Sequence, residues 1–164
     1  MEDAVAHVLI RPARKEDLEA LGKFGAHLMS LHHEWDEERF IPADGGTPRS
    51  YADWLESQLG RKNTVIMVAE IDDAAAGYAY AGLEGHDYMS LRGPAGVIHD
   101  IFVDLRQRGK GVGRKLLEAV LAELAARGMR QVVLSTAARN ETAQRMFDAA
   151  GFRRTMIEMT KTLK

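Results

Sequence analysis

The sequence has 164 residues, a length typical of one domain, and we expect residues 1–164 to form a single domain. Hydrophobic residues make up 46% of the chain and charged residues 28%, which excludes a disordered or fibrous protein. Lys and Arg number 22 against 24 Asp and Glu, giving a net charge of -2. This balance argues against general binding to nucleic acid or to an anionic membrane, so any anionic ligand must be bound by a local cluster of charges.

Cysteine is absent, which excludes disulfides, thiolate metal sites and a cysteine nucleophile. The first residues do not resemble a signal peptide, because Glu2 and Asp3 open the chain and Arg11 interrupts the first apolar run. The apolar stretches are also much shorter than the ~20 residues that cross a bilayer. We therefore expect a cytoplasmic protein with no membrane anchor.

The first hundred or so residues predict one strand, two helices, a hairpin and a further strand. Residues 8–10 predict a strand that ends at Pro12, and leucines spaced three and four apart over 15–35 predict an amphipathic helix. Two prolines and a Gly-Gly pair predict a loop over 41–48, and a second helix is expected over 51–59. The next expected strands, the first two of which form the hairpin, are 64–71, 77–83 and 97–103.

The second half predicts two more helices and two more strands. The apolar spacing over 111–127 predicts a helix that Gly128 terminates, and 132–135 predicts a strand. Asn140 can cap a helix that stops at Gly151, and residues 153–162 are expected to close the fold as a strand. The pattern indicates an α/β fold, with one mixed sheet and helices on its faces.

The most informative segment is RGKGVG at residues 108–113, between a predicted strand and a predicted helix. Its three alternating glycines can adopt positive φ and allow a ligand close to the backbone. Their N–H groups would converge on a helix N-terminus carrying about half a positive charge, which suits a phosphate. A helix entry that merely needs flexibility is the alternative. The cations beside these glycines are Arg108, Lys110 and Arg114.

Two common phosphate-binding motifs do not fit this segment. The nucleoside triphosphate loop G-x-x-x-x-G-K-[ST] does not occur. The dinucleotide fingerprint needs G-x-G-x-x-G followed ~20 residues later by an acidic side chain. Here the spacing is G-x-G-x-G, and position 133 is valine.

The segment resembles instead the coenzyme A signature of the GNAT superfamily of N-acyltransferases. Residues 10–13 (IRPA) resemble its first strand, and residues 140–143 (NETA), Phe147 and residues 151–152 (GF) resemble its last helix and the turn after it. The resemblance implies a mixed sheet of about six to seven strands flanked by about four helices, splayed between the fourth and fifth strands. It also implies acetyl-CoA as co-substrate, and no metal.

The resemblance further implies which residues hold coenzyme A. The pyrophosphate would lie on the glycine turn, and the pantetheine arm would pair with the exposed backbone of the fourth strand. An amide N–H of that strand would polarise the thioester carbonyl. The residues that the resemblance assigns to coenzyme A are Ile101, Phe102, Val103, Arg108, Gly109, Lys110, Gly111, Val112, Gly113, Arg114 and Asn140.

Proton transfer needs separate candidates. An amine of pKa ~10.4 costs roughly 4.6 kcal/mol to deprotonate at pH 7, and relatives often carry a glutamate on the fourth strand as base. This sequence has His99 and Asp100 there, and because strand residues alternate between faces we expect only one of them to reach the cleft. His99, Asp100 or neither could be the base. The family's tyrosine acid is replaced by Phe147, but a thiol of pKa ~8.5 costs only about 2 kcal/mol to leave as thiolate.

The acceptor is expected to be a small-molecule or peptide amine. The acidic segment at residues 32–40 could attract it through His33, Glu34 and Asp36, although such a segment is also typical of a solvated helix end. We therefore expect an N-acetyltransferase that transfers the acetyl group directly in a ternary complex. An acyl-CoA-binding sensor without turnover is the alternative. The resemblance also allows a homodimer.

Overall fold

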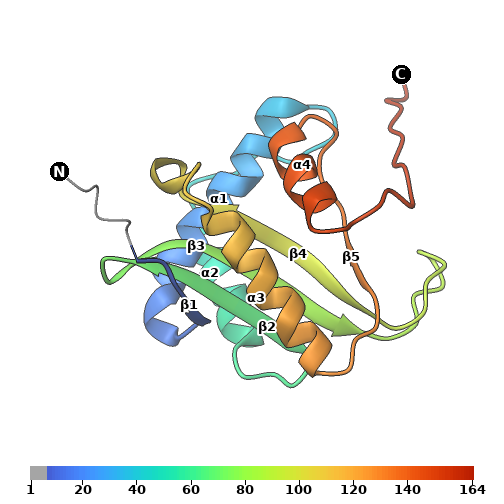
Figure 1. Cartoon of the computed structure of the whole chain (residues 1–164). Coiled ribbons are helices and arrows are strands. Elements are labelled where there is room, and N and C mark those ends of the chain that lie inside the picture. The colour runs from blue at the N-terminus through green and yellow to red at the C-terminus, as the bar shows by residue number, and fades with distance from the viewer. Residues whose placement is uncertain (1–6) are drawn as a thin grey trace.

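The computed structural model describes residues 7–164. Within this range five strands form one sheet in the order β1-β2-β3-β4-β5 (Figure 1). Strands β1 to β4 are antiparallel to their neighbours, and β5 runs parallel to β4. The mixed sheet of the expected α/β fold is therefore confirmed. The strands are β1 (Leu9–Pro12), β2 (Thr64–Ile71), β3 (Ala74–Glu84), β4 (Ala95–Val103) and β5 (Val132–Leu134).

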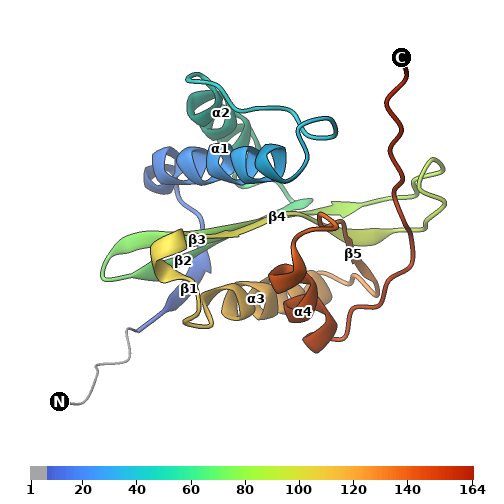
Figure 2. The same cartoon turned by 90° about the horizontal axis from the view of Figure 1, so that it is seen from above.

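Four α-helices cover the two faces of this sheet. Figure 2 shows α1 and α2 on one face and α3 and α4 on the other. Short 3-10 turns at Lys15–Asp17 and Leu105–Gln107 precede α1 and the glycine turn. The longest helix has 18 residues, and none of the described helices is long and apolar enough to span a bilayer. The helices are α1 (Leu18–Trp35), α2 (Thr47–Gln58), α3 (Val112–Ala126) and α4 (Glu141–Ala149).

Two apolar clusters, one on each face, hold the helices to the sheet. On one face, Leu116 and Leu124 of α3 are fully buried against the strands. Under α1 and α2, Leu21 and Leu55 pack against Tyr78 of β3. The side chains alternate along β3 and β4, so each strand contributes to both clusters. The sheet is therefore covered by helices on both faces.

A charged cluster fastens the edge strand β1 to the start of α1. The Nη1 atom of Arg11 donates to Oδ2 of Asp17 at 2.8 Å, and its Nε donates to Oε2 of Glu70 at 2.8 Å. The side chains of Arg11 and Asp17 are only 14% and 9% exposed. Asp17 also accepts from the backbone N–H of Arg14, and the pairing with Arg11 lowers the pKa of Asp17.

The sheet splays between β4 and β5, as expected. The pairing joins Gly96 to Val132 and ends where Ile98 meets Leu134. After Ile98, β4 continues to Val103 without a partner on that side among the described residues. This opening exposes one backbone edge of the second half of β4.

The strand expected at residues 153–162 is not formed, so the sheet holds five strands rather than six or seven. The segment is extended but exposed, and none of its backbone pairs with the sheet in the described chain. Its polar contacts run elsewhere, because Glu158 pairs with Arg39 and the Thr162 hydroxyl donates to Glu38. The prediction of a strand here was wrong because a ladder of backbone hydrogen bonds needs a neighbouring strand within reach, and this segment has none in the described chain.

Candidate active site

A β-bulge in β4 sets the geometry of the site. Tyr80 of β3 pairs with Asp100, but the next residue, Ala81, pairs with Ile98, so His99 is an extra residue. A bulge interrupts the alternation of side chains. His99 and Asp100 therefore line the same cavity, on the side of the sheet that α1 and α2 cover. The expectation that only one of them reaches the cleft was wrong for this reason.

The cavity has a volume of about 220 Å³ and lies between α1, α2 and β4. The α1 residues in its wall are spaced three and four apart, so they share one helix face. Apart from His99 and Asp100, its lining is mostly apolar. The lining residues are Gly25, Leu28, Met29, His32, Phe40, Ile41, Tyr51, His99 and Asp100.

Gly25 allows Tyr51 to reach into this cavity. A Cβ at position 25 would lie 2.3 Å from the Tyr51 ring, so only glycine leaves room for the ring against α1. Tyr51 then donates its hydroxyl hydrogen to Oδ2 of Asp100. Sequence reasoning missed Tyr51, although the spacing of Gly25 from Leu21 and Leu28 on α1 marked a position where a neighbour comes close.

Asp100 is the acidic group of the cavity. Tyr78, which is fully buried, also donates to its Oδ2, at 3.1 Å. Burial raises the pKa of Asp100 to about 6 and raises the pKa of Tyr78 as well. Oδ1 of Asp100 has no hydrogen-bond partner in the described part of the chain. At neutral pH the cavity therefore presents a carboxylate with one free oxygen in apolar surroundings.

His99 is held by a carboxylate on the neighbouring strand. Its Nε2 lies 2.6 Å from Oε1 of Glu84, and its ring stacks on Tyr80 with centroids 5.4 Å apart. The other oxygen of Glu84 accepts from Nη2 of Arg92 at 2.8 Å. Because a carboxylate only accepts hydrogen bonds, we assign the proton of neutral His99 to Nε2, which leaves a lone pair on Nδ1.

The glycine turn has the backbone conformation that the sequence indicated. Gly109 and Gly111 have φ of 76° and 77°, and a Cβ at either would meet no atom within 4 Å. The first helical bond of α3 runs from Lys115 N to Gly111 O. The backbone N–H groups of residues 109–114 donate to no acceptor among the described residues. They form an open cradle at a helix N-terminus, which suits an anionic ligand.

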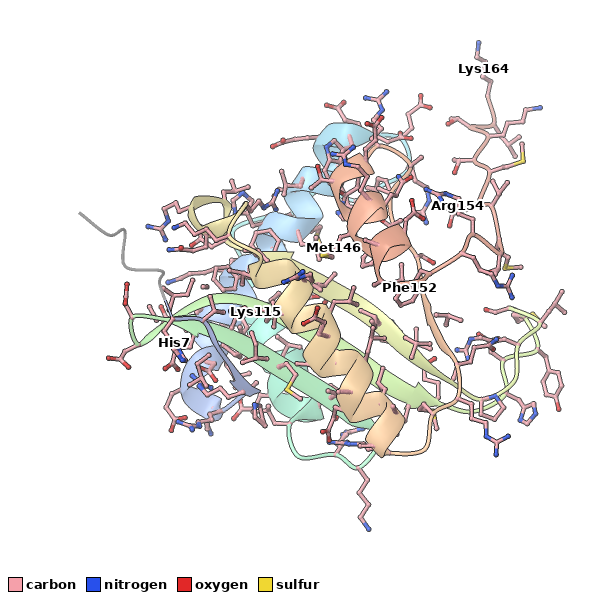
Figure 3. All side chains as sticks on the ribbon, viewed as in Figure 1. His7, Lys115, Met146, Phe152, Arg154 and Lys164 are labelled. Atoms are coloured by element: carbon pink, nitrogen blue, oxygen red, sulfur yellow. The ribbon has the colours of Figure 1, made fainter. Side chains whose placement is uncertain are left out.

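Gly113 serves a different purpose from the other two. A Cβ there would lie 3.3 Å from Sδ of Met146, on α4, and 3.6 Å from Val103. Met146 lies between α4 and the start of α3 (Figure 3). The third glycine of the motif therefore lets α3 pack closely on α4 and β4, in addition to offering its N–H.

The cations of the turn lie on the surface near it. Nε of Arg108 donates to the Val103 carbonyl at 3.1 Å, and its guanidinium lies 5.5 Å from the centroid of the Phe102 ring. Partial burial lowers the pKa of Arg108. Lys110 donates to Gln107, and Arg114 lies 3.6 Å from Glu118. All three can reorient towards an anion on the turn, since these contacts are exposed.

The open edge of β4 is narrower than expected. Asp104 N donates to Ala76 O, and the antiparallel pattern alternates from there, so the Phe102 backbone points towards β3. Ile101 and Val103 point their N–H and C=O groups to the open side. The exposed backbone expected over residues 101–103 is thus confined to these two residues, and the Phe102 side chain is buried at 2% exposure.

The last helix provides a cap and an apolar residue. The side chain of Asn140 accepts from Ala143 N at 3.2 Å, which confirms Asn140 as the N-cap of α4. Phe147 is 6% exposed, belongs to the core under α3 and packs edge-to-face with Phe152 at 5.8 Å. No hydroxyl is therefore available at position 147.

The three acceptor residues expected on the acidic segment do not line the cavity. Nδ1 of His33 bonds to the Phe40 carbonyl at 2.7 Å, Glu34 is exposed, and Asp36 accepts from Arg39 N. On a helix, residues 33 and 34 lie away from the face that carries 25, 28, 29 and 32, so His32 faces the cavity instead. Within residues 7–164, no three His, Asp or Glu side chains converge as metal ligands do.

Three known proteins are similar to this chain in sequence. A mycothiol acetyltransferase of Thermobispora bispora is 38% identical over 152 residues, which cover 82% of this chain and 49% of that protein. An uncharacterized N-acetyltransferase of Archaeoglobus fulgidus is 32% identical over 65% of this chain and 69% of its own. The L-amino acid N-acyltransferase MnaT of Escherichia coli is 26% identical over 87% of this chain and 78% of its own. The chain spans about half the length of the first of these.

Solved structures share the fold. Aminoglycoside N-acetyltransferase AAC(6')-Iy, in complex with CoA, superposes with a TM-score of 0.77 at 21% identity, covering 100% of this chain and 99% of that one. A mutant of the BH1408 protein from Bacillus halodurans gives 0.80 at 18% identity over 95% and 99%. The family match extends over residues 28–152, from the middle of α1 through the bulge and the glycine turn to Phe152. This chain therefore belongs to the Acetyltransferase (GNAT) family.

Proposed function

We propose that the chain transfers an acetyl group from acetyl-CoA to a small primary amine with an apolar body, directly and in a ternary complex. One observation carries this proposal: β4 combines an open backbone edge, a glycine turn at its end and a bulge that lines a cavity. A donor on the edge and turn would therefore lie next to an acceptor in the cavity. The N-acetyltransferase relatives support the reaction class. We also propose that the enzyme acts in the cytoplasm.

The glycine turn suits the pyrophosphate of acetyl-CoA. The unpaired N–H groups of residues 109–114 and the open space above Gly109 and Gly111 provide a cradle that any larger residue would strain. Arg108, Lys110 and Arg114 add charge around the turn. The pantetheine amides would bond to the outward-facing backbone of Ile101, with Asn140 nearby on α4.

The cavity indicates the kind of acceptor. Asp100 is the only carboxylate among the described residues that line it, and its walls include Leu28, Met29, Phe40 and Ile41. One carboxylate can bind one ammonium group, while the walls would bury an apolar body. A polyamine or an aminoglycoside needs several acidic partners, and the acidic side chains expected to supply them lie outside. A monoamine with an aliphatic or aromatic body fits these walls better.

His99 acts as the base in this proposal. Its Nδ1 lone pair takes a proton from the ammonium group, and Glu84 stabilises the imidazolium through Nε2. The freed amine attacks the thioester carbon, forming the C–N bond, the nitrogen then loses its second proton to solvent water, and the C–S bond breaks. An outward N–H of β4 stabilises the developing oxyanion. Coenzyme A leaves as a thiolate, at a cost of about 2 kcal/mol at pH 7, since Phe147 offers no proton.

Calorimetry combined with a thiol-release assay tests the proposal. Acetyl-CoA is titrated into the wild type and into Gly111→Trp, whose side chain would fill the cradle. The wild type is then assayed with aliphatic and aromatic monoamines, polyamines, aminoglycosides, amino acids and peptides. We expect binding that the substitution abolishes, and release of free thiol with the monoamines.

The other outcomes distinguish the remaining readings. Binding without thiol release on any amine would favour an acyl-CoA sensor, for which the absence of a hydroxyl at Phe147 is the structural argument. Release with polyamines alone would refute the apolar acceptor while keeping the transfer. No binding of acetyl-CoA would refute both functions.

A further inference from the structure

One polar side chain in the wall of the acceptor cavity has no part in the proposed reaction. Asp100 would bind the ammonium group, Tyr51 bonds to Asp100, and His99 would take the proton. The remaining polar side chain among the described residues of the wall is that of His32, which comes from α1 and is half-buried. The role inferred below for His32 rests on the proposed function, because it concerns the same cavity.

A hydrogen bond to its own helix fixes the tautomer of His32. Nδ1 lies 2.8 Å from the carbonyl oxygen of Leu28, which can only accept a hydrogen bond. Nδ1 therefore donates, and the neutral ring has a lone pair on Nε2. No described residue bonds to Nε2, and no buried side-chain nitrogen or oxygen in the described chain lacks a partner. Nε2 is therefore accessible to a ligand.

Aromatic neighbours hold the ring of His32 in one orientation. It packs edge-on against the rings of Trp35 and Phe40, with centroids 5.0 Å apart in both pairs. Phe40 is itself fixed, because its carbonyl accepts from Nδ1 of His33 at 2.7 Å and its N–H donates to the Asp36 carbonyl at 3.0 Å. A side chain held in this way loses little freedom when it binds a ligand, so a hydrogen bond to it costs little entropy.

The position of His32 on α1 suggests which part of an acceptor it meets. Gly25 of α1 packs against the Tyr51 ring, and Tyr51 in turn holds Asp100. His32 lies seven positions further along the same helix, which corresponds to about 10 Å along its axis. The helix face between them carries two apolar residues that also line the cavity. An acceptor bound through its ammonium group at Asp100 would extend along this apolar face towards His32.

We propose that His32 selects acceptors that carry a hydroxyl group at the end of the apolar body remote from the amine. The hydroxyl would donate its hydrogen to Nε2 while the ammonium group binds Asp100. A second ammonium group fits less well, because it would be buried against a neutral ring with no carboxylate to pair with it. A carboxylate fits less well too, because Nε2 has no hydrogen to donate and acidic residues follow closely in the sequence. These residues are Glu34, Asp36, Glu37 and Glu38.

Matched amines test the role of His32. Alkylamines from propyl to octyl are each compared with the amino alcohol that carries a hydroxyl on the last carbon, with acetyl-CoA at pH 8. At the length that reaches His32, we expect kcat/KM of the wild type to be about 3- to 10-fold higher for the amino alcohol. Shorter amino alcohols should react more slowly than their alkylamines, because the hydroxyl would be buried without a partner. A wild type that gains nothing from the hydroxyl at any length, or that prefers the matching diamines, would overturn the proposal.

Two substitutions separate recognition by His32 from packing. His32→Phe keeps an aromatic ring beside Trp35 and Phe40 but removes the hydrogen-bond acceptor, so the advantage of the amino alcohol should disappear. His32→Gln presents an amide oxygen and should restore part of that advantage. His86→Phe is the matched control, since His86 is exposed and lies outside the cavity wall, and it should keep the full advantage. If His32 only packs, His32→Phe would change the rates of both amines equally, which would also overturn the proposal.

Binding measurements distinguish this inference from the proposed function. Calorimetry of the protein with coenzyme A gives the Kd of each amine without turnover, and the amino alcohol should again bind about 3- to 10-fold more tightly than the alkylamine. This preference without thiol release would support the role of His32 and refute the transfer of the acetyl group. Thiol release without the preference would refute the role of His32 alone.

Discussion

The Nε2 atom of His99 lies 2.6 Å from Oε1 of Glu84, on the adjacent strand β3. Arg92 occupies the other oxygen of the same carboxylate, so Glu84 is fixed on both sides. This places a histidine of defined tautomer at the bulge of β4, with its second nitrogen free. His99 lines the cavity and Glu84 lies outside it, so substitutions of these two residues should differ in their effects on the reaction.

Substitution of His99 should lower kcat more than it changes KM. His99→Gln removes the proton acceptor, and we expect kcat to fall by roughly 10²- to 10⁴-fold. Glu84→Gln keeps the shape but removes the charge that stabilises the imidazolium, so kcat should fall by about 10-fold. Steady-state kinetics with a monoamine measures both. Glu123→Gln, which alters an ion pair on α3, is the control. Equal losses in His99→Gln and in the control would show that another group accepts the proton.

Asp100 should govern amine binding rather than the chemical step. Asp100→Asn leaves the ammonium without a charged partner, and we expect KM for the amine to rise roughly 10- to 100-fold with a smaller change in kcat. In the wild type, protonation of Asp100 should raise KM as the pH falls below about 6. This pH dependence should disappear in the variant. Its persistence in Asp100→Asn would assign the titration to a different group.

The ionised form of Asp100 should favour amine binding but lower the stability of the folded protein. Burial raises the pKa of Asp100 from 3.8 to about 6, so the folded state favours the protonated form. The stability associated with this form is present below the unfolded pKa and is lost as the pH rises through about 6. Asp100→Asn should therefore raise Tm at pH 8 relative to the wild type, with little difference at pH 4. Thermal unfolding at the two pH values measures this, and a variant that is less stable at pH 8 would contradict it.

The sequence predicted most of this site through local patterns. The glycine turn, the cap at Asn140 and the splay between the fourth and fifth strands all follow from motifs that act over a few residues or from family likeness. The bulge at His99 does not, because it depends on the register of β3 against β4, which no pattern within β4 reveals. The contact between Gly25 and Tyr51 joins two helices, and it too needs the tertiary fold.

The errors have the same origin. The acidic segment after His32 drew attention as an acceptor site because of its charge, but the rotation of α1 decides which side chains face the cavity. The closing strand was expected over residues 153–162 from its place at the end of the chain, and that place does not say whether a sheet edge lies within reach. Motifs within one segment were therefore predictable from the sequence, while the contacts between segments distant in sequence were not.

The two kinds of glycine in the turn should respond differently to alanine. Gly111 has φ of 77°, which costs an L-residue about 1–2 kcal/mol, so Gly111→Ala should weaken coenzyme A binding by roughly 10-fold. Gly113 has no positive φ, and the tightest contact of a Cβ there, at 3.3 Å, is with the flexible end of Met146, so Gly113→Ala should bind within about threefold of the wild type. Gly45→Ala, in open space on a loop, is the control. Calorimetry with coenzyme A would contradict this assignment if Gly113→Ala proved the weaker binder.

Acid stability should depend on the pair formed by Arg11 and Asp17. The pairing lowers the pKa of Asp17, so its contribution is present above the unfolded value of ~3.9 and is lost as the pH falls below it. Asp17→Asn should lower the free energy of unfolding by about 2 kcal/mol at pH 7, because a nearly buried guanidinium loses one of its two carboxylates. At pH 3 the difference should shrink. Urea unfolding at both pH values measures this.

The control is Asp53→Asn. The carboxylate of Asp53 is 66% exposed and lies 3.9 Å from Arg49, so this substitution should change the free energy of unfolding by less than about 0.5 kcal/mol. A loss in Asp17→Asn that stays constant between pH 7 and pH 3 would show that the carboxylate contributes packing rather than charge.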